Sequence, residues 1–257
     1  MSMRAPRPFS AEPIVDLQSG GRSDAGWRAT AERALPWWRR MVKGLRPRIS
    51  SRARTNAETA ASRTYRQLAR RILADFAPTE GGRRIIVAST GSVTLCTEAL
   101  LMLAYFIRDE LGCRILLVDD PTFGDTVGER LGFSSERGLL DSVHENDRSA
   151  AELIQPTARA GISILPKGMA DPDALSAFQL RRIPLILQEA TRRFDYVLVQ
   201  QSSILDDRRH RSFAAGADLS LLFVEEGTSS MDELELYQRA MTDAQAQNVR
   251  LVLCTSA

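Results

Sequence analysis

The 257-residue chain contains no apolar run that approaches the roughly 20 residues needed to cross a bilayer as a helix. Its first residues also lack the continuous apolar core of a signal peptide, so we predict a cytoplasmic protein. The three cysteines are an odd number without metal-ligand spacing, and reduced thiols are the simplest interpretation. The two histidines have no partners nearby in the sequence. We therefore expect structural or surface roles for them and no metal site.

A strong excess of one charge is absent as well. The 34 basic and 32 acidic side chains give a formal net charge of +2, which makes no general case for nucleic-acid binding. The charge is unevenly distributed, however. Residues 1–55 contain 12 Arg or Lys against 4 Asp or Glu, an excess of 8 positive charges, and the remainder carries an excess of 6 negative charges.

This basic end predicts two regions, a flexible segment at residues 1–55 and a folded domain at residues 56–257. Met1–Gly26 is rich in Pro, Gly, Ser and Arg, a composition typical of disorder. The stretch Trp27–Arg48 that follows mixes aromatic and basic side chains, which suits an anionic membrane surface or an acidic partner. A short amphipathic helix docked on its own domain and a solvated linker are the alternatives. The candidate binding residues in this stretch are Trp37, Trp38, Arg39, Arg40 and Lys43.

Strands and helices are predicted to alternate through the folded domain. Apolar runs indicate six strands, at residues 83–88, 114–119, 162–166, 195–200, 219–224 and 249–254. Helical patterns are found at residues 56–76, 95–111, 150–155, 172–193, 206–215 and 229–247. Such alternation predicts the α/β class, with a mostly parallel sheet and helices on both faces.

The first predicted strand, Arg83–Ala88, leads through a loop of small residues into an apolar helical pattern. Strand, loop and helix in this order are the layout of a phosphate-binding loop, whose motif is G-x-x-x-x-G-K-[ST]. Here Gly91–Thr97 reads GSVTLCT, so Cys96 occupies the place of the lysine and Thr97 the place of the following hydroxyl. The scaffold of a nucleotide-binding loop is present, and most of its chemistry is replaced.

Further motifs follow in a fixed order: Arg63–Arg70 reads RTYRQLAR, Ile115–Pro121 reads ILLVDDP, Gly138–Val143 reads GLLDSV, Leu165–Gly168 reads LPKG and Phe194–Ser203 reads FDYVLVQQSS. This series resembles the cytosolic domain of the bacterial tyrosine kinases (BY-kinases) of capsule and exopolysaccharide synthesis, relatives of the MinD/ParA group of P-loop ATPases. The resemblance covers about residues 63–257. It implies a P-loop NTPase-like fold of the MinD/BY-kinase type.

Measured against this family, the nucleotide-binding positions depart from the motif. The loop lysine is replaced by Cys96, and the acidic residue that organises the metal on the fourth strand is replaced by Gln200. Thr97 and Asp119 keep the residue types that the family uses. The resemblance therefore implies a degenerate nucleotide site with no catalytic residue, no metal site and no cofactor. ATP and Mg²⁺ are expected only under the alternative of an active enzyme. Its candidate residues are Gly91, Ser92, Thr94, Cys96, Thr97, Asp119 and Gln200.

We therefore predict a catalytically inactive, BY-kinase-like binding or regulatory module of exopolysaccharide synthesis and export, cytoplasmic and peripheral to the inner membrane. The resemblance implies that it docks on an inner-membrane chain-length regulator (co-polymerase). The basic, tryptophan-containing N-terminal segment suits docking beside an anionic membrane surface, and nothing in the sequence selects nucleic acid. Arg66 is the candidate residue for a homo-oligomer interface.

Two alternatives remain. One is an active ATPase or protein tyrosine kinase with a divergent loop, in which Lys167 replaces the missing lysine. The other is a MinD/ParA-like positioning factor on membrane or DNA.

Overall fold

The computed structural model describes residues 17–19, 54–90, 93–119, 126–145, 149–201, 208–225 and 229–256. These residues form one eight-stranded sheet with the order β1-β8-β7-β2-β6-β3-β5-β4. Every neighbouring pair is parallel except β4 and β5. The strands are β1 (Leu17–Ser19), β2 (Arg83–Ser89), β3 (Ile115–Val118), β4 (Gln155–Pro156), β5 (Ile162–Leu165), β6 (Tyr196–Gln201), β7 (Leu219–Glu225) and β8 (Val249–Ser256). The predicted α/β class with a mostly parallel sheet is confirmed.

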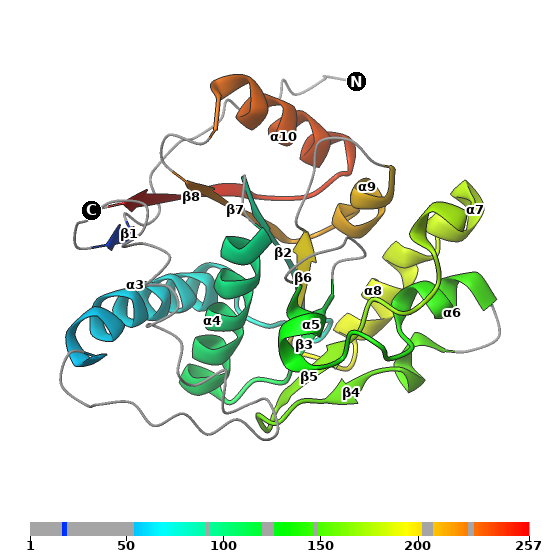
Figure 1. The fold of residues 1–257 in the computed structure, drawn as a ribbon, viewed down its shortest axis with the longest axis horizontal. Helices are drawn as coiled ribbons and strands as arrows, with labels where there is room; N and C mark the ends of the chain where they lie inside the picture. The colour runs from blue at the N-terminus through cyan, green and yellow to red at the C-terminus, as the bar shows by residue number, and fades with distance from the viewer. Residues whose placement is uncertain are drawn as a thin grey trace.

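The helices cover both faces of this sheet (Figure 1). They are α3 (Arg54–Asp75), α4 (Val93–Leu111), α5 (Val127–Leu131), α6 (Leu139–Glu145), α7 (Ala177–Leu180), α8 (Ile183–Thr191), α9 (Arg208–Ala214) and α10 (Met231–Asp243), with 3-10 turns η1 (Ala150–Glu152) and η2 (Pro172–Ala174). The helix predicted over residues 172–193 is thus divided among η2, α7 and α8. None of the helices in the described part of the chain is both long enough and apolar enough to span a membrane.

Two strands were missed by sequence reasoning, and each corrects a prediction. β1 pairs with Cys254–Ser256 of β8, so the predicted flexible segment at residues 1–55 is wrong for Leu17–Ser19. A sheet edge exposes unpaired backbone N–H and C=O groups, and pairing with them leaves little trace in side-chain pattern. The short helix predicted at residues 150–155 is only the turn η1, because Pro156 disfavours helical backbone in the residue before it and Gln155 starts β4. Helix α3 also begins at Arg54, two residues before the predicted domain boundary.

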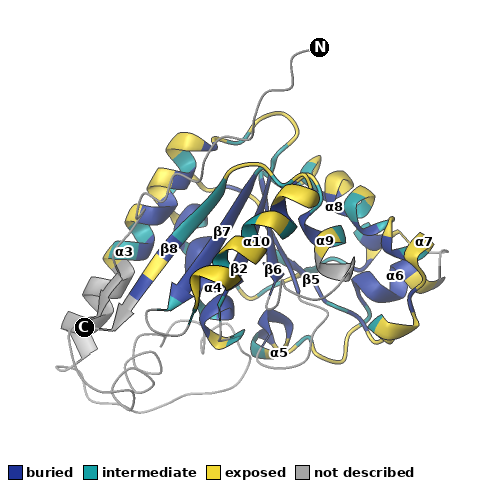
Figure 2. Cartoon of the chain, turned by 90° about the horizontal axis from the view of Figure 1, so that it is seen from above, coloured by how far each residue is buried: buried dark blue, intermediate teal, exposed yellow. Residues whose placement is uncertain are grey.

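The core consists of two layers, one on each side of the sheet. Ile85 and Val87 of β2 pack with α3 and α4, while Ile86 and Ala88 pack with the helices of the other face, including α8 and α10. All four are fully buried, as expected when a parallel strand is covered on both sides. Figure 2 shows this layering, with buried strands beneath helices whose outer sides are exposed. Each of the larger side chains contributes about 1.5–3 kcal/mol through burial of its apolar surface.

Charged groups tie the amino ends of the strands together. Asp218 accepts hydrogen bonds from the side chain of Arg83, at 3.0 Å, and from the backbone N–H of Arg84, at 2.8 Å. Asp195 accepts from the backbone N–H of Arg114 at 2.7 Å and forms an ion pair with its guanidinium at 3.0 Å. The hydrogen bond from Arg114 is the main reason why the pKa of Asp195 lies below its usual range. These contacts hold the sheet at the end opposite the carboxyl edge.

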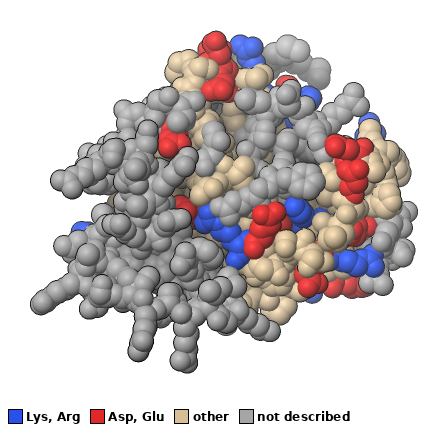
Figure 3. Space-filling view, in the orientation of Figure 1, with Lys and Arg blue, Asp and Glu red and all other residues tan. Residues whose placement is uncertain are grey.

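Charged side chains of both signs are mixed on the molecular face drawn in Figure 3. Over the described residues visible there, basic and acidic groups lie beside one another instead of forming a large patch of one sign. Long-range attraction of nucleic acid depends on such a single-sign patch. The described residues on this face therefore add no support to DNA binding.

Candidate functional site

The candidate site lies where three parallel strands end next to the first turns of two helices. β2, β3 and β6 are neighbours in the sheet, so their carboxyl ends meet at one edge. Helix α4 begins shortly after β2, and α5 follows β3. In open parallel sheets this edge is where ligands bind. Of the predicted nucleotide-site residues, Gly91 and Ser92 lie outside the described residues, while Thr94, Cys96 and Thr97 lie in α4.

Cys96 faces the sheet and not the open edge. It is fully buried, and its Sγ donates to the carbonyl oxygen of Val87 at 3.1 Å and lies 3.8 Å from that of Gln201. Both carbonyls belong to strands beneath the helix. The position at which the resembled family has its loop lysine therefore holds a packed thiol.

Gln200, at the end of β6, joins the first turns of α4 and α5. Its Nε2 donates to Thr97 Oγ1 at 2.7 Å, and its Oε1 accepts from the backbone N–H of Val127 at 2.8 Å. The hydroxyl of Thr97 in turn donates to the carbonyl oxygen of Val93 at 3.0 Å. Thr97 and Gln200 are almost completely buried, so this neutral network is shielded from water. The structure thus brings these two predicted residues into direct contact.

Asp119 makes the equivalent connection from β3. Its Oδ1 accepts from the backbone N–H of Gly128 at 2.9 Å, and the carboxylate is buried. A Cβ atom at position 128 would lie only 2.0 Å from Asp119 Oδ2, so the close approach requires glycine. Adjacent residues of α5 therefore bind Gln200 and Asp119, and this short helix closes the candidate site from one side.

These residues do not fit a nucleotide with Mg²⁺. Mg²⁺ requires oxygen ligands, usually carboxylates, phosphates and water. Gln200 instead directs the hydrogens of its amide at Thr97 Oγ1, the retained hydroxyl that would bind the metal. These hydrogens would repel a cation placed there. Phosphate binding would also lack the cation that Cys96 replaces.

The remaining predicted residues lie elsewhere or outside the described part of the chain. Thr94 is exposed in the first turn of α4. Lys167, which one alternative would use in place of the loop lysine, follows β5 and pairs with Glu129 of α5 at 3.8 Å. Trp37, Trp38, Arg39, Arg40 and Lys43 lie outside the described residues.

Arg66, the candidate oligomer residue, has partners within its own chain. It pairs with Glu110 of α4 at 3.3 Å, lies 3.6 Å from Asp109 and stacks over the ring of Phe106 at 5.0 Å. These contacts join α3 to α4. Its role in assembly stays a prediction.

Two contributions were missed from the sequence. The first is the amino end of α5, whose Val127 and Gly128 supply the backbone donors described above. A capping threonine, Thr126, with a glycine two residues later was the available signal, and Thr126 does cap this helix.

The second missed residue is Asp141. Its carboxylate accepts from Gly138 N at 2.8 Å, from Met169 N at 3.0 Å and from Ala170 N at 2.8 Å. This residue binds the GLLDSV motif to the residues that follow the LPKG motif. The two motifs, which are distant in the sequence, are therefore in contact in the folded chain.

Comparisons with known proteins test the fold. No protein-family model matches the chain, and no curated protein sequence is significantly similar to it. Among solved structures, the kinase domain of the Escherichia coli tyrosine kinase ETK matches with a TM-score of 0.65 and 19% identity, over 86% of this chain and 87% of that chain. The BceF tyrosine kinase domain matches with a TM-score of 0.60 and 18% identity, over 77% of this chain and 78% of that chain.

A plasmid partition protein from Borrelia burgdorferi is similar over 67% of this chain and 78% of that chain, with a TM-score of 0.53 and 14% identity. At these identities the likeness establishes the fold. The chain therefore has the P-loop NTPase-like fold of the bacterial tyrosine kinase domains, as its sequence motifs predicted.

Proposed function

We propose that this protein is a catalytically inactive relative of the bacterial tyrosine kinases, a binding module in which the nucleotide site has been filled by its own side chains. The observation that carries the proposal is the position of Gln200. Its amide bridges Thr97 and the backbone of Val127 where the resembled family organises Mg²⁺. A neutral, hydrogen-bonded group replaces a charge there.

The energetics favour this closed state over a site that binds nucleotide. A Mg²⁺ ion that entered would displace the Gln200 amide and leave the buried N–H of Val127 without its acceptor. An unsatisfied buried group of this kind costs about 1–3 kcal/mol. The contacts that would normally offset such a cost, a lysine and an acidic metal partner, are replaced by Cys96 and Gln200. Phosphoryl transfer depends on these electrostatic contacts, so we expect no kinase activity.

The partner follows from the resemblance. We propose that the module docks on an inner-membrane chain-length regulator of exopolysaccharide synthesis, at the cytoplasmic side of the membrane. The basic segment Trp27–Arg48 supports this placement by its composition, because basic and tryptophan side chains favour an anionic membrane surface. Deleting Trp27–Arg48, which leaves β1 and α3 in place, and measuring the association of the protein with vesicles and with the regulator tests this part. Unchanged association would exclude the segment from docking.

Calorimetry with ATP and ADP, with and without Mg²⁺, tests the central claim. We expect no heat of binding and no thermal stabilisation at nucleotide concentrations of about 1 mM. A ligand present at about 100 times its Kd would stabilise the fold by about 2.7 kcal/mol, an effect that thermal unfolding detects readily. Micromolar binding that requires Mg²⁺ would overturn the proposal. It would direct attention to hydrolysis and tyrosine phosphorylation.

A matched pair of variants strengthens this test. Cys96→Lys alone restores only the loop cation, whereas Cys96→Lys with Gln200→Asp restores both missing charges. If the closed network excludes nucleotide, the double variant gains binding and the single variant gains little. If the single variant binds nucleotide no better than the wild type and the double variant binds it more tightly, Gln200 is the group that blocks the site.

A further inference from the structure

We propose that a small pocket beside α8 binds a short, branched aliphatic carboxylate. The pocket lies between α8, the turn η1 and the end of β5, and it shares no residue with the candidate nucleotide site. The proposal therefore does not depend on the proposed function. The lining residues are Ser149, Ala150, Ala151, Ile154, Leu165, Ile186, Glu189, Ala190 and Arg193.

The floor of this pocket is aliphatic. Leu165, Ala150 and Ala190 are buried there within the second core layer, and Ile154 and Ile186 are partly buried against the same layer. The cavity volume is about 70 Å³. This is roughly half of the ~150 Å³ apolar cavity that admits benzene, so it holds an isopropyl or isobutyl group but not a nucleobase.

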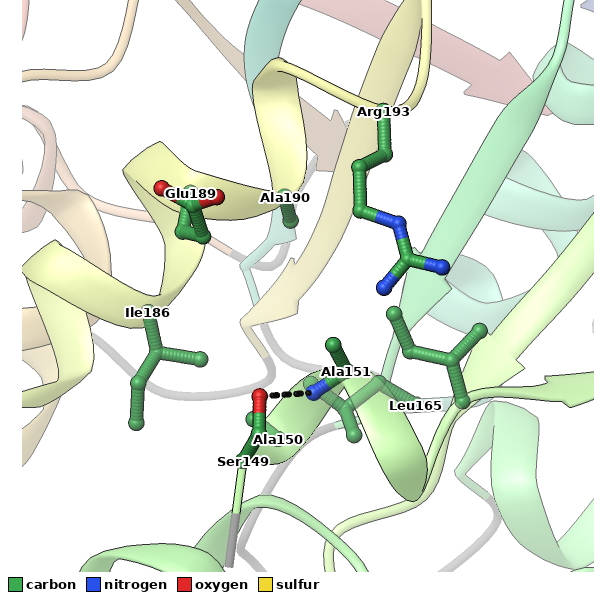
Figure 4. A pocket seen from close by; sticks show the side chains of 9 residues that line it. Ser149, Ala150, Ala151, Leu165, Ile186, Glu189, Ala190 and Arg193 are labelled. Carbon is green, nitrogen blue, oxygen red and sulfur yellow. Dashed lines mark hydrogen bonds between the residues drawn. The ribbon is translucent and has the colours of Figure 1, made fainter.

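The mouth of the pocket carries a positive charge. The side chain of Arg193 extends from the end of α8 toward Leu165 and Ala151 (Figure 4). The carboxylate of Glu189, which also lines the pocket, forms its ion pair with Arg192, at 2.8 Å, and not with Arg193. Within the described part of the chain, Arg193 forms no ion pair of its own.

Ser149 supplies a second polar group at the rim. Its Oγ accepts a hydrogen bond from the backbone N–H of Ala151 at 3.3 Å, which leaves the hydroxyl proton available to donate (Figure 4). An aliphatic floor, a guanidinium and a hydroxyl donor together match a ligand with a branched hydrocarbon end and a carboxylate head. Such a ligand can be a free short-chain acid or the C-terminal leucine of a peptide, which presents the same two groups.

The test is a titration of the full chain with 4-methylpentanoate, followed by the methyl NMR signals of Ile154, Leu165 and Ile186. We expect saturable shifts with a Kd in the millimolar range, which is typical of so few contacts. Arg193→Gln should weaken binding by about tenfold or more, because it removes a charge-assisted hydrogen bond. Arg181→Gln, at an exposed arginine outside the pocket lining, is the matched control and should leave the Kd unchanged.

Two further arms make the result decisive. Ala151→Leu fills the pocket and should abolish the NMR shifts while the melting temperature is retained. The alcohol 4-methylpentanol, which lacks the negative charge, should bind more weakly than the acid. Absence of shifts, equal binding of acid and alcohol, or equal effects of the two arginine variants would each overturn the proposal. N-acetyl-leucine distinguishes the sources: tighter binding than 4-methylpentanoate indicates a peptide C-terminus, and weaker binding indicates a free acid.

Discussion

Replacing Gln200 by leucine removes the amide network at the candidate site while keeping a side chain of similar volume. The buried N–H of Val127 then loses its acceptor, which costs about 1–3 kcal/mol. Thr97 loses one accepted hydrogen bond but still donates to the carbonyl oxygen of Val93, so its share is about 0.5–1.5 kcal/mol. We expect the free energy of unfolding to fall by about 2–4 kcal/mol in total, a large part of the ~5–15 kcal/mol typical of a domain.

Urea denaturation measures this loss. For an m-value of about 2–3 kcal/mol/M, the expected loss lowers the midpoint by roughly 1 M and leaves the slope unchanged. The control is Gln188→Leu, on the exposed side of α8, which should alter the free energy of unfolding by no more than about 0.5 kcal/mol. A loss of less than about 1 kcal/mol for Gln200→Leu would refute the reasoning, since the amide would then not be holding the two helices.

The remaining predictions concern single contacts. Gly128→Ala should destabilise the protein by about 1–3 kcal/mol in thermal unfolding, because the new Cβ would lie 2.0 Å from Asp119 Oδ2. The control is Gly81→Ala, whose new Cβ would have no atom within 4 Å and which should leave the stability unchanged. Asp141→Ala leaves buried backbone N–H groups without acceptors and should cost about 2–4 kcal/mol in urea denaturation; a near-neutral result would show that water replaces the carboxylate. The hydrogen bond from Arg114 lowers the pKa of Asp195 in the folded protein. The ionised carboxylate therefore stabilises the fold at pH values above its unfolded pKa of about 3.9. This stabilisation is lost as the pH falls through the lower pKa of the folded state. The stability difference between wild type and Asp195→Asn should therefore shrink below about pH 4, and a pH-independent difference would contradict the assignment.

Much of the fold could be predicted because burial on both faces of a parallel strand leaves a direct pattern in the sequence. Ile115–Val118 is apolar at every position, and the strand formed by these residues is buried on both sides. The short strand β1 could not be predicted in this way. Its pairing with β8 uses backbone groups, which all residue types except proline carry in full.

The sequence alone determines that Cys96 and Gln200 stand where the resembled family has a lysine and an acidic residue. Only the tertiary structure decided what these residues do instead. Residues distant in the chain meet there, so that Gln200 contacts Thr97 and Val127 across the ends of the sheet. Hydrogen bonds act over about 3 Å, and sequence spacing does not encode which groups come that close. The same holds for the pocket beside α8, whose charge and aliphatic floor come from separate elements that only packing brings together.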